Sequence, residues 1–314
     1  MNNFIFSLNA TIPIFLIMVI GILLKKLNII NDEFEKGLNK FVFNLALPLL
    51  LFQDISSTNF IKLWDSKFVI FCFITTFISI IISYFVSMFF KDKSIQGEFI
   101  QSSYRSSASI IGIAFVQNIY GNIGASPLML IGAVPLYNVT AVIVLSLFNK
   151  KEHNLNKQMI TKTLRGIITN PIIIGIFLGL IWSLSGFKKS IILNKTLSSL
   201  ASTATPLGLI TIGASFNLKK AFRKIKPALI CSVFKLLVFC ILFIPFAVAI
   251  GYRNDYLVTI LVMLGSATTV SSYIMAKNMG HEGTLTSSVV MLTTMFSSVT
   301  LTFWIFILKS LSLI

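Results

Sequence analysis

Residues 265–280 read GSATTVSSYIMAKNMG, and this stretch decides how the rest of the chain is interpreted. Six of the eight positions from 266 to 273 carry a hydroxyl group, and a glycine stands at either end of the stretch. The surrounding sequence is apolar enough for a lipid bilayer, where a hydroxyl must find a partner or line a wet cavity. We therefore expect an interrupted segment here, with its hydroxyls facing a polar path, and not an ordinary membrane helix.

The composition of the whole chain is that of a multi-pass membrane protein. Of the 314 residues, 55% are hydrophobic and only 11% are charged, whereas about 25% are charged in a soluble domain. Several apolar runs reach the roughly 20 residues that cross a bilayer as a helix. Ten spans are expected, near residues 5–24, 37–54, 67–90, 97–120, 124–148, 167–186, 196–216, 226–250, 255–276 and 284–308.

The basic residues predict the orientation of these spans. Of the 26 lysines and arginines, 17 fall in the odd-numbered loops and seven in the even-numbered loops and the C-terminal end. Cytoplasmic loops are enriched in Lys and Arg, so we expect both termini outside the cytoplasmic membrane. The same enrichment explains the net charge of +16 without a nucleic-acid partner. The sequence therefore predicts the lipid bilayer as the environment of this protein.

Recurring spacings predict that the chain is a repeat. The matches are Pro13 with Pro171 and Pro48 with Pro206 at 158 residues, and Cys72 with Cys231 and SAS (107–109) with SAT (266–268) at 159. The offset divides the chain into 1–148 and 167–314, joined by a basic cytoplasmic linker at 149–166. Five spans in each half would insert the second half upside down, as in many secondary transporters.

The second, fourth, seventh and ninth spans are the polar ones, interrupted by glycine or proline. Pro48 and Pro206 each remove a backbone hydrogen bond, which either marks a functional break or only shapes packing. Gly265, like Gly213, fits a helix break or a close helix contact equally well. These four spans are where a site is expected, because polar groups inside a membrane must be buried in protein or line water.

Two cations lie well inside spans, whereas the acids lie at or near span ends and no span carries a central acid. Arg105 is in the fourth span and Lys235 is midway along the eighth, where a charge is costly and therefore a functional candidate. Lys235 has an alternative interpretation, in which it pairs with the carbonyl groups of a broken helix. Cations, hydroxyls and exposed helix N-termini favour an anion as the ligand.

The sequence offers no catalytic or metal-binding set. The two histidines, His153 and His281, fall in loops without a cysteine or an acid at ligand spacing. We expect no enzyme activity, no cofactor and no metal. A receptor is disfavoured too, because the chain has no room for a soluble output domain.

Five segments resemble, in order, the auxin efflux carrier family of bacterial and plant membrane transport proteins. The matching residues are Asn44 and Pro48 in LNKFVFNLALPLLLFQDIS, Arg105 and Gly112 in SYRSSASIIGIAF, Pro135 and Asn138 in AVPLYNVTAVIVLS, Lys235, and Ser271, Ser272 and Lys277 in TVSSYIMAKNMG. The resemblance covers essentially the whole chain. Ala114 and Ala267 depart from it, because the family usually has proline at both positions, and Ser106 or Ser107 replaces an Asn that commonly follows the Arg.

The resemblance implies an all-α membrane protein of two inverted five-helix repeats, with helices 4 and 9 broken and crossing near the membrane centre. It also implies movement of organic anions: auxin in plants, and malate or malonate in some bacterial members. Without the two prolines, glycine and hydroxyl side chains would have to make the breaks.

The hypothesis that follows is a secondary active or facilitated transporter. It would move a small organic carboxylate anion across the cytoplasmic membrane by alternating access. The candidate substrate-binding residues are Asn44, Arg105, Ser109, Gly112, Asn138, Lys235, Thr268, Thr269, Ser271 and Ser272, and the candidate helix breaks are Pro48, Pro206 and Gly265.

The alternative hypothesis is a sodium- or proton-coupled cation antiporter with a similar inverted-repeat fold, which the missing intramembrane acid disfavours. The sequence leaves the substrate, its direction, the coupling ion and a homodimeric state open.

Overall fold

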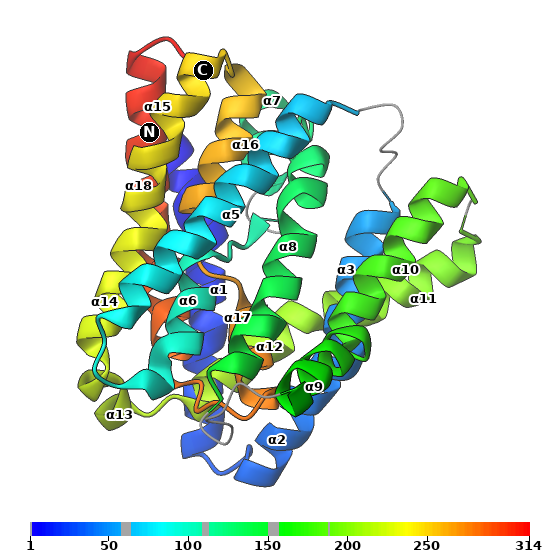
Figure 1. The fold of residues 1–314 in the computed structure, drawn as a ribbon, viewed down its shortest axis with the longest axis vertical. Coiled ribbons are helices and arrows are strands. Elements are labelled where there is room, and N and C mark those ends of the chain that lie inside the picture. Colours follow the sequence, from blue (N-terminus) through cyan, green and yellow to red (C-terminus); the bar gives the residue numbers. More distant parts are fainter. Residues whose placement is uncertain (1, 58–63, 109–112, 150–156, 188) are drawn as a thin grey trace.

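The chain forms a helical bundle in the computed structural model, which describes all residues except 1, 58–63, 109–112, 150–156 and 188 (Figure 1). The described residues form helices and connections, with no strand among them. Seven of their segments are long and apolar enough to cross a membrane, which agrees with a multi-pass membrane protein. They are Asp32–Ser56, Ser66–Met88, Ser126–Leu147, Ile191–Ser215, Ile225–Ile250, Asn254–Asn278 and Thr284–Ser310.

Four of these seven segments change helix type or are interrupted along their length. They consist of α2 (Asp32–Phe41), the π-helix η1 (Val42–Ala46) and α3 (Leu47–Ser56); α11 (Ile191–Ser202) and α12 (Ala204–Ser215); α14 (Ile225–Val233), the π-helix η4 (Phe234–Val238) and α15 (Phe239–Ile250); and α16 (Asn254–Gly265) and α17 (Val270–Asn278). The other three are single helices, namely α5 (Ser66–Met88), α8 (Ser126–Leu147) and α18 (Thr284–Ser310). Interruptions therefore gather in the segments that the sequence marks as polar or proline-containing.

Shorter helices and one further long helix complete the fold. They are α1 (Asn2–Lys26), the 3₁₀ turn η2 (Lys93–Ile95), α6 (Gln96–Tyr104), α7 (Ile113–Tyr120), α9 (Lys157–Ile168), α10 (Pro171–Ser185) and α13 (Leu218–Arg223). Helices α1 and α10 occupy the expected first and sixth spans. Helices α6 and α7 share the expected fourth span, on either side of an interruption.

The expected linker contains a helix. The sequence predicts a basic connection at residues 149–166, but α9 covers Lys157–Ile168 and ends two residues before α10. Pro171 stands at the first turn of α10, and the side chain of Asn170 accepts a hydrogen bond from the Ile172 amide at 2.9 Å. A proline cannot continue a preceding helix but fits the first turn of a new one, so the chain turns at this point.

Two helix pairs pack unusually closely, through glycines on one partner. Helix α1 packs on α12, where a side chain at Gly21 would overlap the carbonyl oxygen of Ile210. Helix α10 packs on α3, where a Cβ at Gly179 would lie 3.1 Å from the carbonyl oxygen of Phe52. Adding 158 to 21 and 52 gives 179 and 210, so the two contacts are related by the spacing of 158 residues seen in the sequence. Small residues allow this approach because nothing separates the backbones.

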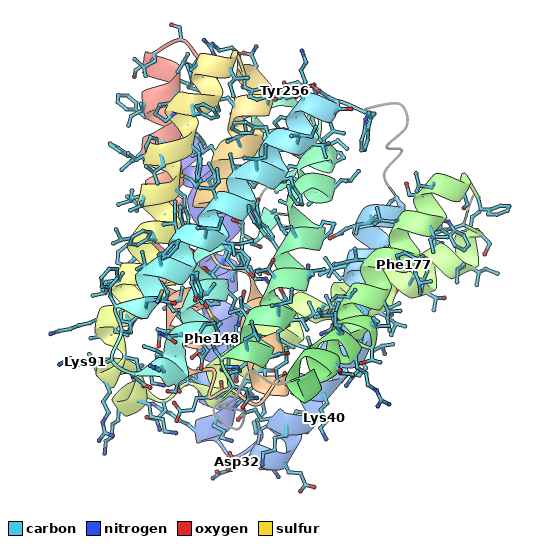
Figure 2. All side chains as sticks on the ribbon, viewed as in Figure 1. Asp32, Lys40, Lys91, Phe148, Phe177 and Tyr256 are labelled. Atoms are coloured by element: carbon cyan, nitrogen blue, oxygen red, sulfur yellow. The ribbon has the colours of Figure 1, made fainter. Side chains whose placement is uncertain are left out.

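The two ends of the bundle differ in charge. Both chain termini lie at one end, near Tyr256, whereas Asp32, Lys40 and Lys91 lie at the opposite end (Figure 2). That opposite end carries the N-terminus of α2 together with α9 and α13 (Figure 1). Lys40 and Lys91, from two of the loops expected to be basic, thus lie at the same end of the molecule.

Candidate functional site

Two helix interruptions meet inside the bundle. Helix α6 ends at Tyr104 and α16 ends at Gly265, and the next residues, Arg105 and Ser266, both have extended backbones. The amide of Ser107 donates to the carbonyl oxygen of Ala267 at 2.9 Å. The stretch around Gly265 is therefore not a continuous helix, although Ala267 stands where proline was expected.

Polar side chains satisfy the backbone groups that the interruptions expose. The amide of Thr268 donates to Oγ1 of Thr293 at 3.0 Å, and Oγ1 of Thr268 donates to the carbonyl of Ser102 at 2.8 Å. Nε2 of Gln101 donates to the carbonyl of Ser272 at 2.9 Å. Within a membrane an unpaired backbone group costs several kcal/mol. At this junction, hydroxyl and amide side chains pair with backbone groups that the helix no longer pairs. A proline would avoid one such unpaired group because it has no backbone N–H.

Arg105 lies at this junction and is almost completely buried, with 1% of its surface exposed. Its Nη2 donates to Oδ1 of Asn138 at 2.9 Å and to Oγ of Ser271 at 2.7 Å. Its Nη1 donates to Oε1 of Gln101 at 3.3 Å and lies 2.9 Å from the sulfur of Met275. The guanidinium thereby joins α6, α8 and α17.

All of these partners are neutral. In the part of the chain that the structure describes, the ion pairs lie elsewhere: Lys25 with Asp32 and Glu35, Lys277 with Glu35, and Lys220 and Lys224 with Glu282. The Nε of Arg105 is buried without a hydrogen-bond partner among the described residues. A buried cation normally has a counter-charge, because its hydration is lost. Among the described residues, Arg105 has no such counter-charge within ion-pair distance.

A small cavity lies beside the partners of Arg105. It has a volume of about 40 Å³ and is lined by Leu47, Leu50, Leu51, Ser107, Thr205, Thr269, Val270 and Ser271. Ser271 therefore faces both the guanidinium and the cavity. A site needs about 10–15 Å³ to hold a water molecule, so this volume holds a few waters. Both helix interruptions and the segment after Pro48 contribute to its wall.

Lys235 is fully buried at the end of α16 and not at the cavity. Its Nζ donates to the carbonyl of Leu264 at 2.7 Å and of Met263 at 3.4 Å, and also contacts Oγ of Ser106. These carbonyls belong to the last turn of a helix, where the backbone dipole favours a cation. Of the two interpretations of Lys235, the contacts match pairing with the carbonyls of a broken helix.

The other candidate residues divide into three groups. Thr269 and Ser272 are near the junction: Thr269 hydrogen-bonds Ser271 at 3.2 Å, and the buried Oγ of Ser272 has no partner among the described residues. Asn44 is exposed and its amide donates to the Lys40 carbonyl at 2.9 Å, so it is not brought to Arg105. Ser109 and Gly112 lie outside the described residues.

The candidate helix breaks also differ among themselves. Pro48 follows the π-helix η1, and Pro206 follows an interruption of one residue between α11 and α12. Gly265 is the last residue of α16, where a Cβ would lie 2.7 Å from the sulfur of Cys240. Gly265 therefore both ends a helix and allows a close contact with a neighbouring helix.

Sequence reasoning missed Gln101, Met275 and the role of Glu98. Gln101 precedes Arg105 by one helical turn, and Met275 follows Ser271 by one turn, so helical spacing could have found both. Glu98, with 1% of its surface exposed, accepts from the amides of Gly283 and Thr286 and from the Thr286 hydroxyl, at 2.9–3.0 Å. It is used as a cap for the N-terminus of α18.

Lys189 is a partly buried cation whose partners differ from those of Arg105. Lys189, between α10 and α11, donates to Oε1 of Gln53 at 2.7 Å and lies 5.1 Å from the centre of the Phe52 ring. Burial lowers the pKa of Lys189.

The fold and the junction define a multi-pass membrane protein with a polar interior, and comparison with known proteins gives its family. The family model described as "Membrane transport protein" matches residues 6–305, so the chain belongs to that family. This confirms the resemblance to the auxin efflux carriers.

Two relatives align along nearly their whole length. An "Uncharacterized transporter" of Methanothermobacter thermautotrophicus is 20% identical over 304 residues, covering 96% of this chain and 98% of the relative. A "Putative malonate transporter" of Rhizobium meliloti is 21% identical over 317 residues, covering 95% of both chains.

Proposed function

We propose that this protein is a secondary active or facilitated transporter that moves a small organic carboxylate across the cytoplasmic membrane by alternating access. The observation that carries the proposal is the buried guanidinium of Arg105, whose described hydrogen-bond partners are all neutral. A carboxylate is the complement of this group in both charge and shape. Its arrival supplies the missing counter-charge.

The proposed substrate site is centred on Arg105, Asn138 and Ser271. Nε of Arg105 is a free donor, and Ser271 connects the guanidinium to the cavity of about 40 Å³. A dicarboxylate is larger than this cavity, so the site must widen when the substrate enters. Opening between α3, α12 and α17, the helices that wall the cavity, is the motion that alternating access requires.

The proposed architecture is two inverted five-helix repeats, 1–148 and 167–314, with both termini outside the cell. The paired glycine contacts at Gly21 and Gly179, related by 158 residues, support the repeat. The extended residues that end α6 and α16 support broken fourth and ninth helices that cross. Inverted repeats of this kind carry a substrate site near the bilayer midplane.

Lys235 has a positioning role in this proposal. Its contacts with the Leu264 and Met263 carbonyls hold the end of α16 against Ser106, next to Arg105. Its charge adds to a positive field at the junction, which favours an anion. Direct contact with the substrate is proposed for Arg105 and not for Lys235.

The substrate class follows from the junction and from one relative. A putative malonate transporter is similar along 95% of the chain, and malonate has two carboxylates on a short carbon frame. We propose malonate, malate or a related short dicarboxylate as the first compounds to test.

The test is counterflow in proteoliposomes. Purified protein is reconstituted with labelled malonate, malate, succinate, lactate or indole acetate, with and without a proton or sodium gradient. Uptake of at least one carboxylate is expected for the wild type and is expected to be lost in Arg105→Gln. Arg253→Gln is the matched control, because Arg253 is an exposed loop arginine whose Nη1 donates to backbone carbonyls.

The antiporter alternative predicts a different result in the same vesicles. Sodium-dependent proton flux without any organic anion would favour it and count against the carboxylate proposal. Uptake of a carboxylate that persists unchanged in Arg105→Gln would leave transport standing but would overturn the proposed site.

A further inference from the structure

We propose that a hollow beside α13 binds an anionic phospholipid from the leaflet at the basic end of the bundle. The hollow is apolar, about 130 Å³ in volume, and lies between α13, the start of α14 and α18. Its lining residues are Phe216, Leu218, Ala221, Phe222, Ile225, Ser288, Met291 and Leu292. This site is separate from the Arg105 junction and does not depend on the proposed substrate.

Helix α13 is amphipathic although it is short. Leu218, Ala221 and Phe222 fall on one face, and Lys219, Lys220 and Arg223 fall on the other, as the spacing of a helix dictates. Leu218 and Phe222 are 62% and 69% exposed. An exposed leucine and phenylalanine one turn apart, beside an apolar hollow, are typical of a helix that lies in the membrane interface.

The charge around α13 is strongly positive. Five cations fall between residues 219 and 226: Lys219, Lys220, Arg223, Lys224 and Lys226. Glu282 pairs with two of them, with Lys224 at 2.7 Å and with Lys220 at 3.7 Å. In the described part of the chain, Lys219, Arg223 and Lys226 are exposed and form no ion pair. A cluster of cations at the edge of membrane helices attracts anionic headgroups.

The hollow lies on the apolar side of the charged edge, where the first part of an acyl chain would run. Ser288, Met291 and Leu292 follow the first residue of α18, Thr284, by four to eight positions. At 1.5 Å per residue the hollow extends roughly 6–12 Å from the charged edge into the apolar zone. Cations therefore lie at the rim and an apolar surface lies beneath them, which is the order of groups in a phospholipid.

Membrane orientation alone would account for the cations, because cytoplasmic loops are generally basic. It would not account for the exposed Leu218 and Phe222 or for an apolar hollow directly under the cations. The combination commits the site to one occupant, a phospholipid with a net negative headgroup. A soluble anion would use the cations and leave the hollow unused.

Native mass spectrometry of the full-length protein in detergent tests this site. Dioleoyl phosphatidylglycerol is titrated against dioleoyl phosphatidylcholine, which has the same chains and no net charge. We expect phosphatidylglycerol to bind about tenfold more tightly or better, given three unpaired cations. The triple variant Lys219→Gln, Arg223→Gln, Lys226→Gln should lose this preference.

The matched control removes three exposed cations at the same end, on α1 and α2, as Lys26→Gln, Lys36→Gln, Lys40→Gln. It should keep the preference for phosphatidylglycerol. Phe222→Ser should weaken both lipids, because it removes apolar surface at the hollow and no charge.

Three results would overturn the proposal. One is an unchanged headgroup preference in the α13 triple variant. Another is an equal loss in the control triple variant. The third is competition by glycerol 3-phosphate at the same concentrations as the lipid, which would indicate a site for soluble anions. Surface cations are not needed for folding, so each variant should be available in folded form.

Discussion

Nη2 of Arg105 donates a hydrogen bond to Oγ of Ser271 at 2.7 Å, across 166 residues of sequence. The two residues stand on opposite sides of the junction where the chain leaves α6 and α16. The hydroxyl of Ser271 also lines the cavity beside the junction. A ligand that reached the guanidinium through this cavity would meet Ser271 on its way.

Replacing Arg105 is expected to weaken substrate binding strongly while leaving the fold in place. Arg105→Gln removes the charge and leaves Gln101, Asn138 and Ser271 able to bond one another or water. A charge-assisted hydrogen bond contributes about 1.5–3 kcal/mol, so affinity should fall at least about tenfold. The substrate affinity of Arg105→Lys should lie between those of the wild type and Arg105→Gln, because lysine keeps the positive charge but lacks the planar guanidinium group.

The measurement is substrate-dependent thermal stabilisation of the purified protein, alongside counterflow. Equal stabilisation of the wild type and Arg105→Gln by the transported carboxylate would contradict the role given to Arg105. Arg253→Gln, at an exposed loop position, controls for loss of an arginine as such.

Ser271→Ala and Thr268→Ala are expected to act differently. Ser271 contacts Arg105 and the cavity, so its loss should raise the half-saturating substrate concentration severalfold with little change in stability. Oγ1 of Thr268 donates to the Ser102 carbonyl, so its loss should leave that buried carbonyl unpaired and lower stability by about 1–3 kcal/mol.

Transport kinetics and thermal unfolding of the two variants separate these effects. If both changes together left transport and stability at wild-type values, the hydroxyl cluster would have neither role.

Lys235→Met is expected to destabilise the protein. Lys235 is the described side-chain donor to the Leu264 carbonyl, whereas the Met263 carbonyl also accepts from Ser106 and Tyr137. Methionine fills the space but leaves the Leu264 carbonyl unpaired, at a cost of about 1–3 kcal/mol. The midpoint of thermal unfolding in detergent should fall, and Lys235→Gln, which keeps a donor, should fall less. A midpoint unchanged in Lys235→Met would argue against the capping role.

Gly21→Ala and Gly179→Ala test the two related helix contacts. A Cβ at Gly21 overlaps the Ile210 carbonyl, and one at Gly179 lies 3.1 Å from the Phe52 carbonyl, so both should destabilise and Gly21→Ala more strongly. Gly37→Ala is the matched control, since nothing lies within 4 Å of a Cβ there. It should be neutral or stabilise α2 by about 0.5–1 kcal/mol, as alanine does in a helix. The three unfolding midpoints, ranked in this order, check the packing of α1 on α12 and of α10 on α3.

Many of the helical segments of this protein can be predicted from its sequence. Apolar runs and basic loops predicted a multi-pass helical protein, and the cluster between Gly265 and Gly280 predicted an interrupted segment. Helix α9 was missed within the linker, because its amphipathic pattern of Met159, Ile160 and Leu164 between cations is too polar for a membrane span. Hydrophobicity along the chain is a local property, and so it can be read without knowing the partners of each helix.

The candidate site could be predicted only in part. Arg105, Asn138 and Ser271 stood out as polar residues in apolar segments, and they do lie together. Asn44 stood out in the same way, yet it is exposed and bonds its own helix. Residue type shows that a polar side chain in an apolar segment needs a partner. It does not show whether that side chain faces the interior of the bundle or its surface.

By itself, then, the sequence determined the class of multi-pass helical membrane protein, the recurring spacing of 158–159 residues and the lack of a central acid in the expected spans, because each depends on residue type and spacing alone. The tertiary structure decided which polar groups meet. It joined Arg105 to Ser271, turned Lys235 onto the carbonyls of α16, and assigned Glu98 to the start of α18. Those partners are 29 to 185 residues apart in the chain, and only the packing of helices brings such distant donors and acceptors within hydrogen-bond reach.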